Sequence, residues 1–230
     1  MHGLKRIFYD GDLSGVIELS EEDSRRLKTV LRAKNGDLVQ VLSRDSLAVG
    51  EISAVGKRSV LVRIESVRDI IRPKYNFTVY QCIAKREYMD WIIEKYGELG
   101  VTTIVPVISA RSLPSLKDSA LSRFNSIVRD AVLQSENEFI PYISDAVNIS
   151  KIKAEHENNI VFHERVGEKC FPNIMGVNVG IVIGPEGGFT ENETAMLVEK
   201  GFGLYTPINT VLKAETAAVL FAGMVRIKLT

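Results

Sequence analysis

The sequence predicts an α/β protein built from a mostly parallel sheet with helices on both faces, preceded by a small β-barrel domain. Short β-type runs separated by glycine-containing turns fill residues 1–71, a pattern that is typical of a small barrel. After Pro73, β-type runs alternate with segments of helical periodicity, as in parallel strands joined by crossover helices. Such helices cover both faces of their sheet. We therefore expect two domains, residues 1–71 and residues 72–230.

The barrel is expected from five β-type runs and one helix. Ser20, with Asp23 three residues later, is an N-cap signal and predicts a helix that starts there and continues to Arg32. Gly36 and Gly56 mark turns between strands. The five expected strands are residues 6–9, 16–19, 38–42, 48–52 and 60–64.

The second part is expected to contain five strands and four helices. The clearest helix carries an apolar stripe from Met89 to Leu99 and ends at Gly100. Thr190 and Glu193 form a T-x-x-E capping box, which predicts a helix over residues 190–200. The other expected helices carry their apolar positions within residues 121–131 and 217–227, and the expected strands are residues 77–84, 101–108, 159–163, 177–183 and 202–205.

The composition excludes several classes of protein. Of the 230 residues, 45% are hydrophobic and 25% are charged, the usual balance for a globular protein. Cys82 and Cys170 cannot build a disulfide framework, and no cysteine or histidine pair has metal-ligand spacing, so we expect no metal. The longest apolar run, residues 217–225, is far shorter than the ~18 residues of a membrane span. We expect a cytoplasmic protein that does not bind membranes.

The charges are spread unevenly along the chain. The 29 basic and 29 acidic side chains cancel, but residues 1–86 hold 16 basic and 11 acidic ones, whereas residues 87–230 hold 13 and 18. This predicts a positive first domain and a negative second one. One basic run is dense enough to suit RNA phosphates, although a solvated helix face is the alternative. These candidate RNA-binding residues are Arg25, Arg26, Lys28, Arg32 and Lys34.

A glycine-rich loop follows the apolar strand that ends at Ile183. Its sequence, Gly184-Pro185-Glu186-Gly187-Gly188, leads directly into a predicted helix. Ligands of parallel sheets bind beyond the carboxyl ends of the strands, and glycine lets the backbone approach a ligand closely. The spacing matches neither G-x-G-x-x-G nor a Walker A loop, and the negative Glu186 argues against a phosphate ligand. The alternative is a tight strand–helix turn that simply requires glycine.

A second candidate loop, residues 206–212, follows the last predicted strand and leads into the final helix. Two such loops from neighbouring strands could hold one small molecule between them. Glu215 and Thr216 are candidates for contacting it, or they are ordinary first-turn residues that complement the helix dipole. His163-Glu164 ends another strand, where a lone histidine is more often structural than catalytic.

Two of these motifs together carry a family resemblance. The segment GPEGGFT at residues 184–190, with LKAETA at residues 212–217, resembles the RsmE-type 16S ribosomal RNA uridine-N3 methyltransferases of the SPOUT (trefoil-knotted) class. Further segments are similar to the family in the same order along the chain: VLR at residues 30–32 with Gly36-Asp37, ELGV at residues 98–101 and Gln134-Ser135.

The chain also departs from the family pattern at three places. Lys213 stands where the family has arginine, and Arg26 stands where it has histidine. The segment Leu133-Gln134-Ser135-Glu136-Asn137 replaces the family's E-Q-S-G-R. These changes leave the cofactor motif intact and fall on the side that would face RNA.

The resemblance implies a PUA-like barrel that helps to hold RNA and a knotted methyltransferase domain that works as a homodimer. It implies S-adenosylmethionine as the cofactor and N3 of one uridine in small-subunit ribosomal RNA as the acceptor. Lys213 would favour the N3 anion, and Glu215 would accept or relay the proton. The implied cofactor-binding residues are His163, Glu164, Gly184, Pro185, Glu186, Gly187, Gly188, Pro207, Ile208, Val211, Leu212, Thr216 and Ala217.

Three other functions stay open on the sequence alone. The chain could methylate a different RNA nucleotide, or it could use the same loops and a cofactor to act on a small molecule. The barrel could also bind RNA without catalysis, which would leave the glycine-rich loop without a purpose.

Overall fold

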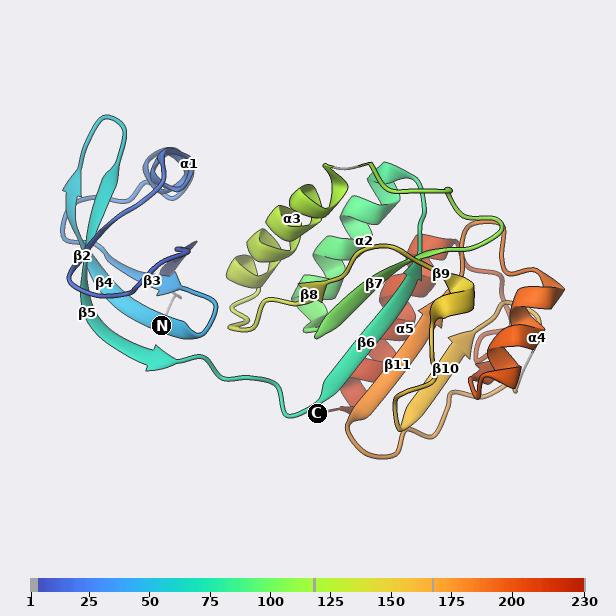
Figure 1. Cartoon of the computed structure of the whole chain (residues 1–230). Helices are drawn as coiled ribbons and strands as arrows, with labels where there is room; N and C mark the ends of the chain where they lie inside the picture. The colour runs from blue at the N-terminus through green and yellow to red at the C-terminus, as the bar shows by residue number, and fades with distance from the viewer. Residues whose placement is uncertain (1–3, 118, 167, 230) are drawn as a thin grey trace. The chain divides into compact units, whose positions relative to one another are not determined.

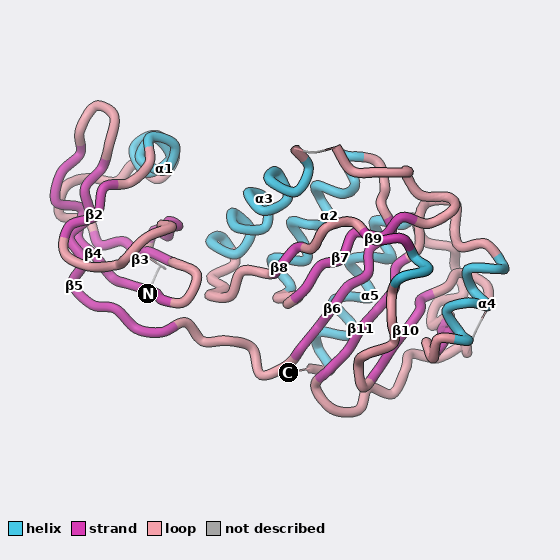
Figure 2. The backbone as a smooth tube through the Cα atoms, viewed as in Figure 1, coloured by secondary structure: helices cyan, strands magenta, loops and turns pink. Residues whose placement is uncertain are grey.

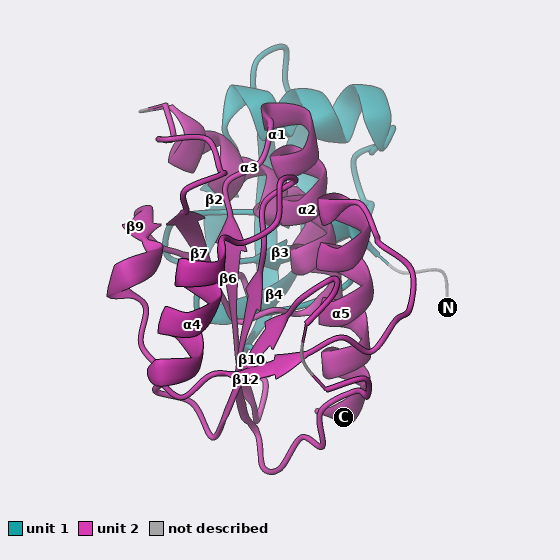
Figure 3. Ribbon diagram, turned by 90° about the vertical axis from the view of Figure 1, so that its right-hand side faces the viewer, with its two compact units in different colours: residues 1–72, 133–139 teal, residues 73–132, 140–230 magenta. Residues whose placement is uncertain are grey.

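The chain forms two compact units that are interleaved in sequence. The computed structural model describes residues 4–117, 119–166 and 168–229 (Figure 1). Unit 1 consists of residues 1–72 and 133–139, and unit 2 of residues 73–132 and 140–230 (Figure 3). The chain therefore leaves unit 1 near Pro73 and returns to it for residues 133–139, which begin with the last two residues of the helix that ends at Gln134.

Unit 1 is a five-stranded mixed sheet with the strand order β1-β3-β4-β5-β2. The first pair, β1 with β3, is parallel, and the other pairs are antiparallel. Its core is formed by alternating strand residues together with Leu27, which is fully buried. The strands are β1 (Lys5–Phe8), β2 (Val16–Glu18), β3 (Leu38–Leu42), β4 (Ser46–Val55) and β5 (Val60–Asp69).

The helix of unit 1 starts where the sequence predicts but is shorter. Ser20 is the N-cap, and its Oγ accepts a hydrogen bond from the N–H of Asp23 at 3.1 Å. The α-helix α1 (Glu21–Arg25) then gives way to a π-helical turn, η1 (Arg26–Val30). The hydroxyl of Thr29 donates to the carbonyl of Arg25 at 2.8 Å, a contact that bends helices. Arg32, at φ 50°, stops the segment.

Unit 2 contains a parallel sheet with the order β12-β10-β11-β6-β7-β8, and β9 pairs with β7. Every strand pair in it is parallel, which confirms the predicted sheet type. Figure 2 shows its longer strands, drawn in magenta, side by side. The strands β8 and β9 have two residues each and carry no periodic signal. The strands are β6 (Asn76–Cys82), β7 (Thr103–Ile108), β8 (Tyr142–Ile143), β9 (Val147–Asn148), β10 (Asn158–Phe162), β11 (Asn178–Ile183) and β12 (Gly203–Tyr205).

Helices cover both faces of this sheet (Figure 3). Along β11, Ile181 packs in the core on the side of α2, α3 and α5, whereas its neighbour Val182 packs with Leu197 of α4. This alternation is the period of two that a strand buried on both faces requires. The helices are α2 (Arg86–Leu99), α3 (Ala120–Gln134), α4 (Glu191–Glu199), α5 (Ala214–Lys228) and the 3-10 turn η2 (Ile149–Lys151).

The helix ends follow local sequence signals. Gly100 caps α2 in the left-handed conformation at φ 72°, which glycine adopts without steric cost. Thr190 and Glu193 form the predicted capping box at the start of α4. None of the helices formed by the described residues is both long and apolar enough to span a bilayer.

Each unit is electrically balanced. Unit 1 holds 13 basic and 13 acidic residues, and unit 2 holds 16 of each. A division at residue 86 assigns Lys74, Lys85 and Arg86 to the barrel and leaves Glu136 and Glu138 in the other half, which creates the apparent imbalance. The prediction of a positive and a negative domain is therefore wrong, because the chain crosses between the units at other positions than that division assumes.

Candidate active site

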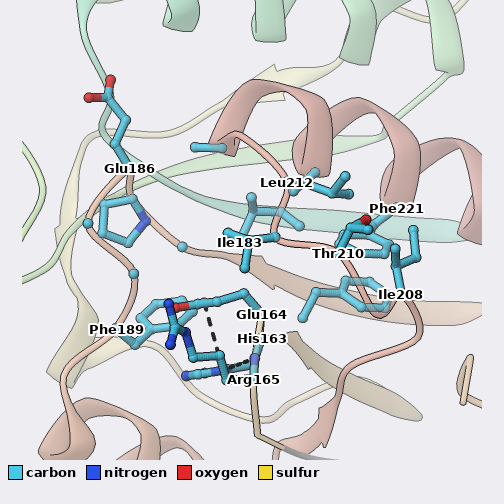
Figure 4. A pocket seen from close by; sticks show the side chains of 18 of the residues that line it. His163, Glu164, Arg165, Ile183, Glu186, Phe189, Ile208, Thr210, Leu212 and Phe221 are labelled. Carbon is cyan, nitrogen blue, oxygen red and sulfur yellow. Dashed lines mark hydrogen bonds and ion pairs between the residues drawn. The ribbon is translucent and has the colours of Figure 1, made fainter. Parts of the chain in front are cut away.

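Three loops meet at the carboxyl ends of three neighbouring parallel strands and enclose one cavity of about 250 Å³ (Figure 4). They follow β10, β11 and β12, which lie side by side in the order β12-β10-β11. This is the edge of a parallel sheet where ligands bind. The lining residues are Phe162, His163, Glu164, Arg165, Ile183, Gly184, Pro185, Glu186, Gly187, Gly188, Phe189, Pro207, Ile208, Thr210, Val211, Leu212, Ala214, Ala217 and Phe221.

The glycine-rich loop after β11 is shaped by a tight turn. The N–H of Gly188 donates to the carbonyl of Pro185 at 2.9 Å. Gly188 has φ +67°, and a Cβ there would lie 2.8 Å from Oε1 of Glu164, across the cavity wall. Both the positive φ and the close approach therefore require glycine at this position.

The capping box fixes the point where this loop enters α4. The hydroxyl of Thr190 accepts from the N–H of Glu193 at 3.2 Å, and Oε2 of Glu193 accepts from the N–H of Thr190 at 2.9 Å. The other carboxylate oxygen of Glu193 accepts from the N–H of Ala110, in the loop after β7, at 2.7 Å. Glu193 is only 8% exposed, so this side chain joins two loops of unit 2 inside the protein.

The loop after β12 offers unused main-chain donors to the cavity. It is anchored at Thr206, whose N–H donates to the carbonyl of Glu168 at 2.8 Å and whose hydroxyl donates to that of Val166 at 2.7 Å. Among the described residues, the N–H groups of residues 208–212 donate to no protein atom. Residues 209–211 are exposed, so solvent can satisfy their N–H groups, and a ligand that presents acceptors can replace that solvent.

His163 has both a structural contact and a place in the cavity wall. Its Nδ1 accepts hydrogen bonds from the N–H groups of Arg165 and Val166, at 3.1 and 3.2 Å. These bonds shape the turn after β10. The ring also lies near Phe189, with 6.3 Å between the ring centres. These contacts give His163 a structural role in the turn, and its place in the cavity wall leaves its expected part in cofactor binding a prediction.

The cavity contains the expected cofactor-binding residues with one exception. Thr216 does not line it, because it faces outward from the first turn of α5. Phe221, one and a half turns further along α5, lines it instead and stacks on Phe162 with ring centres 4.1 Å apart. In the sequence, apolar residues at helical spacing that line a cavity cannot be distinguished from ordinary core residues. The lining residues missed for this reason, or because they flank a motif, are Phe162, Arg165, Ile183, Phe189, Thr210, Ala214 and Phe221.

The two candidate catalytic residues stand beside the cavity and not in its wall. Lys213 is the exposed N-cap residue of α5, and Glu215 is half-buried in its first turn. Leu212 and Ala214, which alternate with them, do line the cavity. Neither charged side chain forms a hydrogen bond or ion pair within the described part of the chain. Both are therefore available to a substrate that approaches the rim.

The candidate RNA-binding residues lie in unit 1, along α1, η1 and the turn that follows. Lys28 already has internal partners, since its Nζ donates to the carbonyls of Gly56 and Lys57 at 3.2 and 2.7 Å. It thereby holds the β4–β5 turn against the helix. The side chains of Arg25, Arg32 and Lys34 are solvent-accessible, as is that of Arg26.

The donor set of the cavity suits S-adenosylmethionine. Apolar walls formed by Ile183, Leu212 and Phe221 alternate with main-chain groups of the loops after β11 and β12, which matches a ligand that has apolar and hydrogen-bonding parts. Among the described residues, no three histidine, cysteine or acidic side chains come together as metal ligands would.

Comparison with known proteins agrees with this site. Residues 72–226 match the RNA methyltransferase domain family, and residues 19–65 match the RNA methyltransferase PUA domain family. The chain is 30% identical to ribosomal RNA small subunit methyltransferase E of Aquifex aeolicus over 221 residues, covering 93% of this chain and 95% of that protein. It is 28% identical to the protein of the same name from Rickettsia conorii, covering 92% and 89%.

Solved structures show the same fold. A putative methyltransferase from Legionella pneumophila, in complex with S-adenosylmethionine, superimposes with a TM-score of 0.85 at 26% identity, covering 98% of both chains. Ribosomal RNA small subunit methyltransferase E from Neisseria gonorrhoeae, bound to S-adenosylmethionine, gives the same TM-score and coverage at 24% identity. The PUA-like unit, the parallel sheet and the cavity at its carboxyl edge thus make this chain a member of the RsmE-type RNA methyltransferase family.

Proposed function

We propose that this chain transfers a methyl group from S-adenosylmethionine to N3 of one uridine in 16S ribosomal RNA. The observation that carries the proposal is the cavity at the ends of β10, β11 and β12, where a glycine-rich loop faces a loop with unused main-chain donors. The membership of the chain in the RsmE-type family supports the substrate class.

The cofactor would be held mainly by main-chain groups. The glycines at 184, 187 and 188 let a ligand approach the backbone, although the carbonyl of Gly187 already accepts from Arg111 and the N–H of Gly188 already donates to Pro185. The main-chain groups of Ile208 and Leu212 have no protein partners among the described residues. S-adenosylmethionine supplies a methyl group on a sulfonium centre when it is bound. Placing this group in line with the acceptor nitrogen can by itself lower the barrier by ~7–11 kcal/mol.

The proton on N3 has to leave before or during transfer. Glu215 is our candidate for accepting or relaying it, since its carboxylate is unpartnered and next to the cavity rim. Lys213, two residues earlier, would stabilise the N3 anion. A positioned base adds roughly 10²–10⁴-fold to the rate.

Unit 1 would hold the RNA, with Arg25, Arg26, Lys28, Arg32 and Lys34 facing the phosphates. The support is their density on one short segment of a PUA-type domain. We keep residues 1–71 and 72–230 as the proposed functional domains. As an enzyme that acts on ribosomal RNA, the protein would work in the cytoplasm.

A homodimer is part of the proposal. Helix α5 exposes Leu220 and Ile227, which are 37% and 74% exposed and seven residues apart, so they share one face. Trp91 of α2, the helix that packs against α5, is 42% exposed. A sedimentation experiment on the wild-type protein and the Ile227→Glu variant tests this: the variant should shift towards monomer.

A trefoil knot also belongs to the proposal. Tyr205 and Thr206, at the end of β12, are hydrogen-bonded to two residues of the loop after β10. The carbonyl of Tyr205 accepts from the N–H of His163 at 2.9 Å, and the N–H of Thr206 donates to the carbonyl of Glu168 at 2.8 Å. The final helix then returns to pack on α2 and β11. This path supports a chain end that passes through the loop after β10.

The function is tested with 16S ribosomal RNA purified from cells that lack the protein. Mass spectrometry before and after incubation with the enzyme and S-adenosylmethionine identifies the methylated nucleotide and atom. A new methyl group on N3 of one uridine is expected. A methyl group at another atom or base would replace the proposed reaction by the alternative of a different RNA nucleotide, and no methylation would refute it.

The base is tested by single-turnover methylation with Glu215→Gln. We expect a rate loss of roughly 10²-fold or more with unchanged S-adenosylmethionine affinity. Glu191→Gln, which changes a first-turn glutamate of α4, is the matched control and should react at the wild-type rate. A wild-type rate for Glu215→Gln removes that carboxylate from the chemistry.

A further inference from the structure

Three basic residues near the cavity lie outside the sequence motifs quoted above for the family resemblance. Lys85 and Arg86 follow β6, and Arg111 follows β7. We call these three residues the rim cluster. The two loops run together, because the N–H of Leu113 donates to the carbonyl of Ile83 at 3.1 Å. Since β6 is the neighbour of β11 in the parallel sheet, the rim cluster lies at the same carboxyl edge as the cavity.

The rim cluster touches the glycine-rich loop directly. Nη1 of Arg111 donates to the carbonyl of Gly187 at 2.9 Å and lies 3.5 Å from that of Phe189. Nζ of Lys85 lies 3.7 Å from Oε2 of Glu186. All three contacted residues line the cavity. Lys85 and Arg111 therefore stand at its rim, within one residue of the groups that would hold the cofactor, and Arg86 is the chain neighbour of Lys85.

The protein itself uses only part of this positive charge. Nε and Nη2 of Arg111 donate to no atom within the described part of the chain. The Arg86 side chain is 74% exposed, and its Nε lies 3.8 Å from Oδ2 of Asp90. Nε of Arg123 lies closer to the same carboxylate, at 2.9 Å from Oδ1. Two carboxylates, those of Glu186 and Asp90, lie within 4 Å of the three cations, and that of Asp90 is shared with Arg123.

We propose that the rim cluster binds a backbone phosphate of the RNA strand next to the nucleotide that enters the cavity. This inference rests on the proposed function, because it takes RNA as the substrate. A guanidinium edge and an ammonium group at one point suit a phosphate, which accepts several charge-assisted hydrogen bonds. S-adenosylmethionine carries no phosphate, so its carboxylate is the competing ligand for these cations.

The proposal gives unit 2 a share in RNA binding. Its balanced charge does not oppose this, because affinity for phosphate depends on local clusters and not on net charge. Each unit would then contribute its own contacts to the RNA. A phosphate fixed beside the cavity would also limit which nucleotide can reach the methyl group.

The test compares RNA binding and cofactor binding in charge variants of the full chain. The triple variant Lys85→Gln, Arg86→Gln and Arg111→Gln is measured with 16S ribosomal RNA transcribed in vitro, across a series of salt concentrations and at saturating S-adenosylhomocysteine. The matched control neutralises three exposed lysines at the opposite end of the strands or helices of unit 2: Lys74, Lys153 and Lys228. Cofactor affinity is measured separately by calorimetry.

We expect the triple variant to bind RNA roughly fivefold more weakly per lost phosphate contact at 0.1 M salt, with the slope of log K against log salt shallower by about 0.7 for each. The control variant should keep most of the affinity and the slope. A second variant, Lys85→Gln with Arg86→Gln, retains the hydrogen bonds of Arg111 to the glycine-rich loop and should show a smaller loss of the same kind.

Unchanged RNA affinity and slope in the triple variant would overturn the proposal. A loss of cofactor affinity alone would also overturn it, because the cluster would then bind the cofactor carboxylate or only hold the loop. A wild-type protein that does not bind the RNA would overturn it as well. Methylation by the wild type is followed in the same preparation. Its absence refutes the proposed function, while the binding comparison still decides whether the rim cluster contacts phosphate.

Discussion

Glu193 is the residue whose removal should disturb the site most through hydrogen bonding. Its buried carboxylate accepts from the N–H and hydroxyl of Thr190 and from the N–H of Ala110. In the Glu193→Ala variant these donors lose their acceptor. The start of α4 and the loop after β7 are then no longer joined, and both carry residues at the rim of the cavity.

The magnitude follows from the bonds that are lost. Loss of the capping box costs ~1 kcal/mol, and loss of the charged acceptor for Ala110 costs a further ~1.5–3 kcal/mol. Since the N–H of Ala110 lies in an exposed residue, water recovers part of the second cost. We expect a total of about 3 kcal/mol, or a melting temperature lower by roughly 6–12 °C for a chain of this size. Glu193→Gln keeps one acceptor oxygen and should lose about half as much.

The assay is urea unfolding of both variants, with calorimetric titration of S-adenosylmethionine on the folded proteins. Affinity for the cofactor should fall together with stability, because the box fixes the end of the glycine-rich loop. Glu199→Ala, an exposed change in the same helix, is the control and should alter stability by less than about 0.5 kcal/mol. If Glu193→Ala has the same free energy of unfolding as the wild type, these hydrogen bonds do not stabilise the fold as their geometry implies, and the reasoning is refuted.

Two substitutions and one thiol-labelling experiment test an ion pair within unit 1 and two buried side chains of unit 2. A hydrogen bond from Arg68 lowers the pKa of Glu138 below its usual 4.5, so the ion pair stabilises the protein above that value and the stabilisation is lost as the pH falls through the lowered pKa. Glu138→Gln should cost up to ~1 kcal/mol at pH 7, and this cost should shrink as the pH is lowered through the acid range. Tyr96→Phe leaves the buried Oε1 of Gln81 without its 2.6 Å donor and should cost about 1–3 kcal/mol in urea unfolding. Burial raises the pKa of Cys82 to about 12, so its thiol should react with a disulfide reagent at pH 8 only after unfolding.

Each of these has a matched comparison. A difference in unfolding free energy between wild type and Glu138→Gln that does not shrink as the pH is lowered through the acid range would contradict the ion-pair account. Replacing the Tyr96–Gln81 pair by Phe and Leu removes both polar groups and should cost less than Tyr96→Phe alone; a larger cost would contradict it. Reaction of Cys82 in the native protein, measured against the exposed Cys170, would show that the sheet opens there.

The strands and helices could be predicted because their signals are local. Ser20, Gly100 and Thr190 cap helices at the positions that the sequence indicates. The helix after Ser20 is shorter than expected, because the hydroxyl of Thr29 competes for a backbone carbonyl. Two-residue strands such as β8 have no periodicity to detect, since only their neighbour β7 defines them.

The site could be predicted in part. The motifs at residues 184–190 and 212–217 identified two of its three walls, and the family resemblance supplied the cofactor. Phe221, Arg111 and Lys85 carried no signal, because an apolar helix position and isolated basic residues look alike whether they face a ligand, the core or solvent. Their roles follow from contacts with residues 59 to 101 positions away in the chain.

The sequence alone determined the two-part architecture, the parallel sheet, the helix caps and the cofactor loops of this protein, because each depends on short-range propensity, periodicity or a contiguous motif. Only the tertiary structure decided the rest. It returned residues 133–139 to unit 1 and so balanced the charge of both units. It also brought the loops after β6 and β7 to the rim of the cavity. Both results depend on where distant segments meet, which is set by sheet order and packing and not by neighbours in the chain.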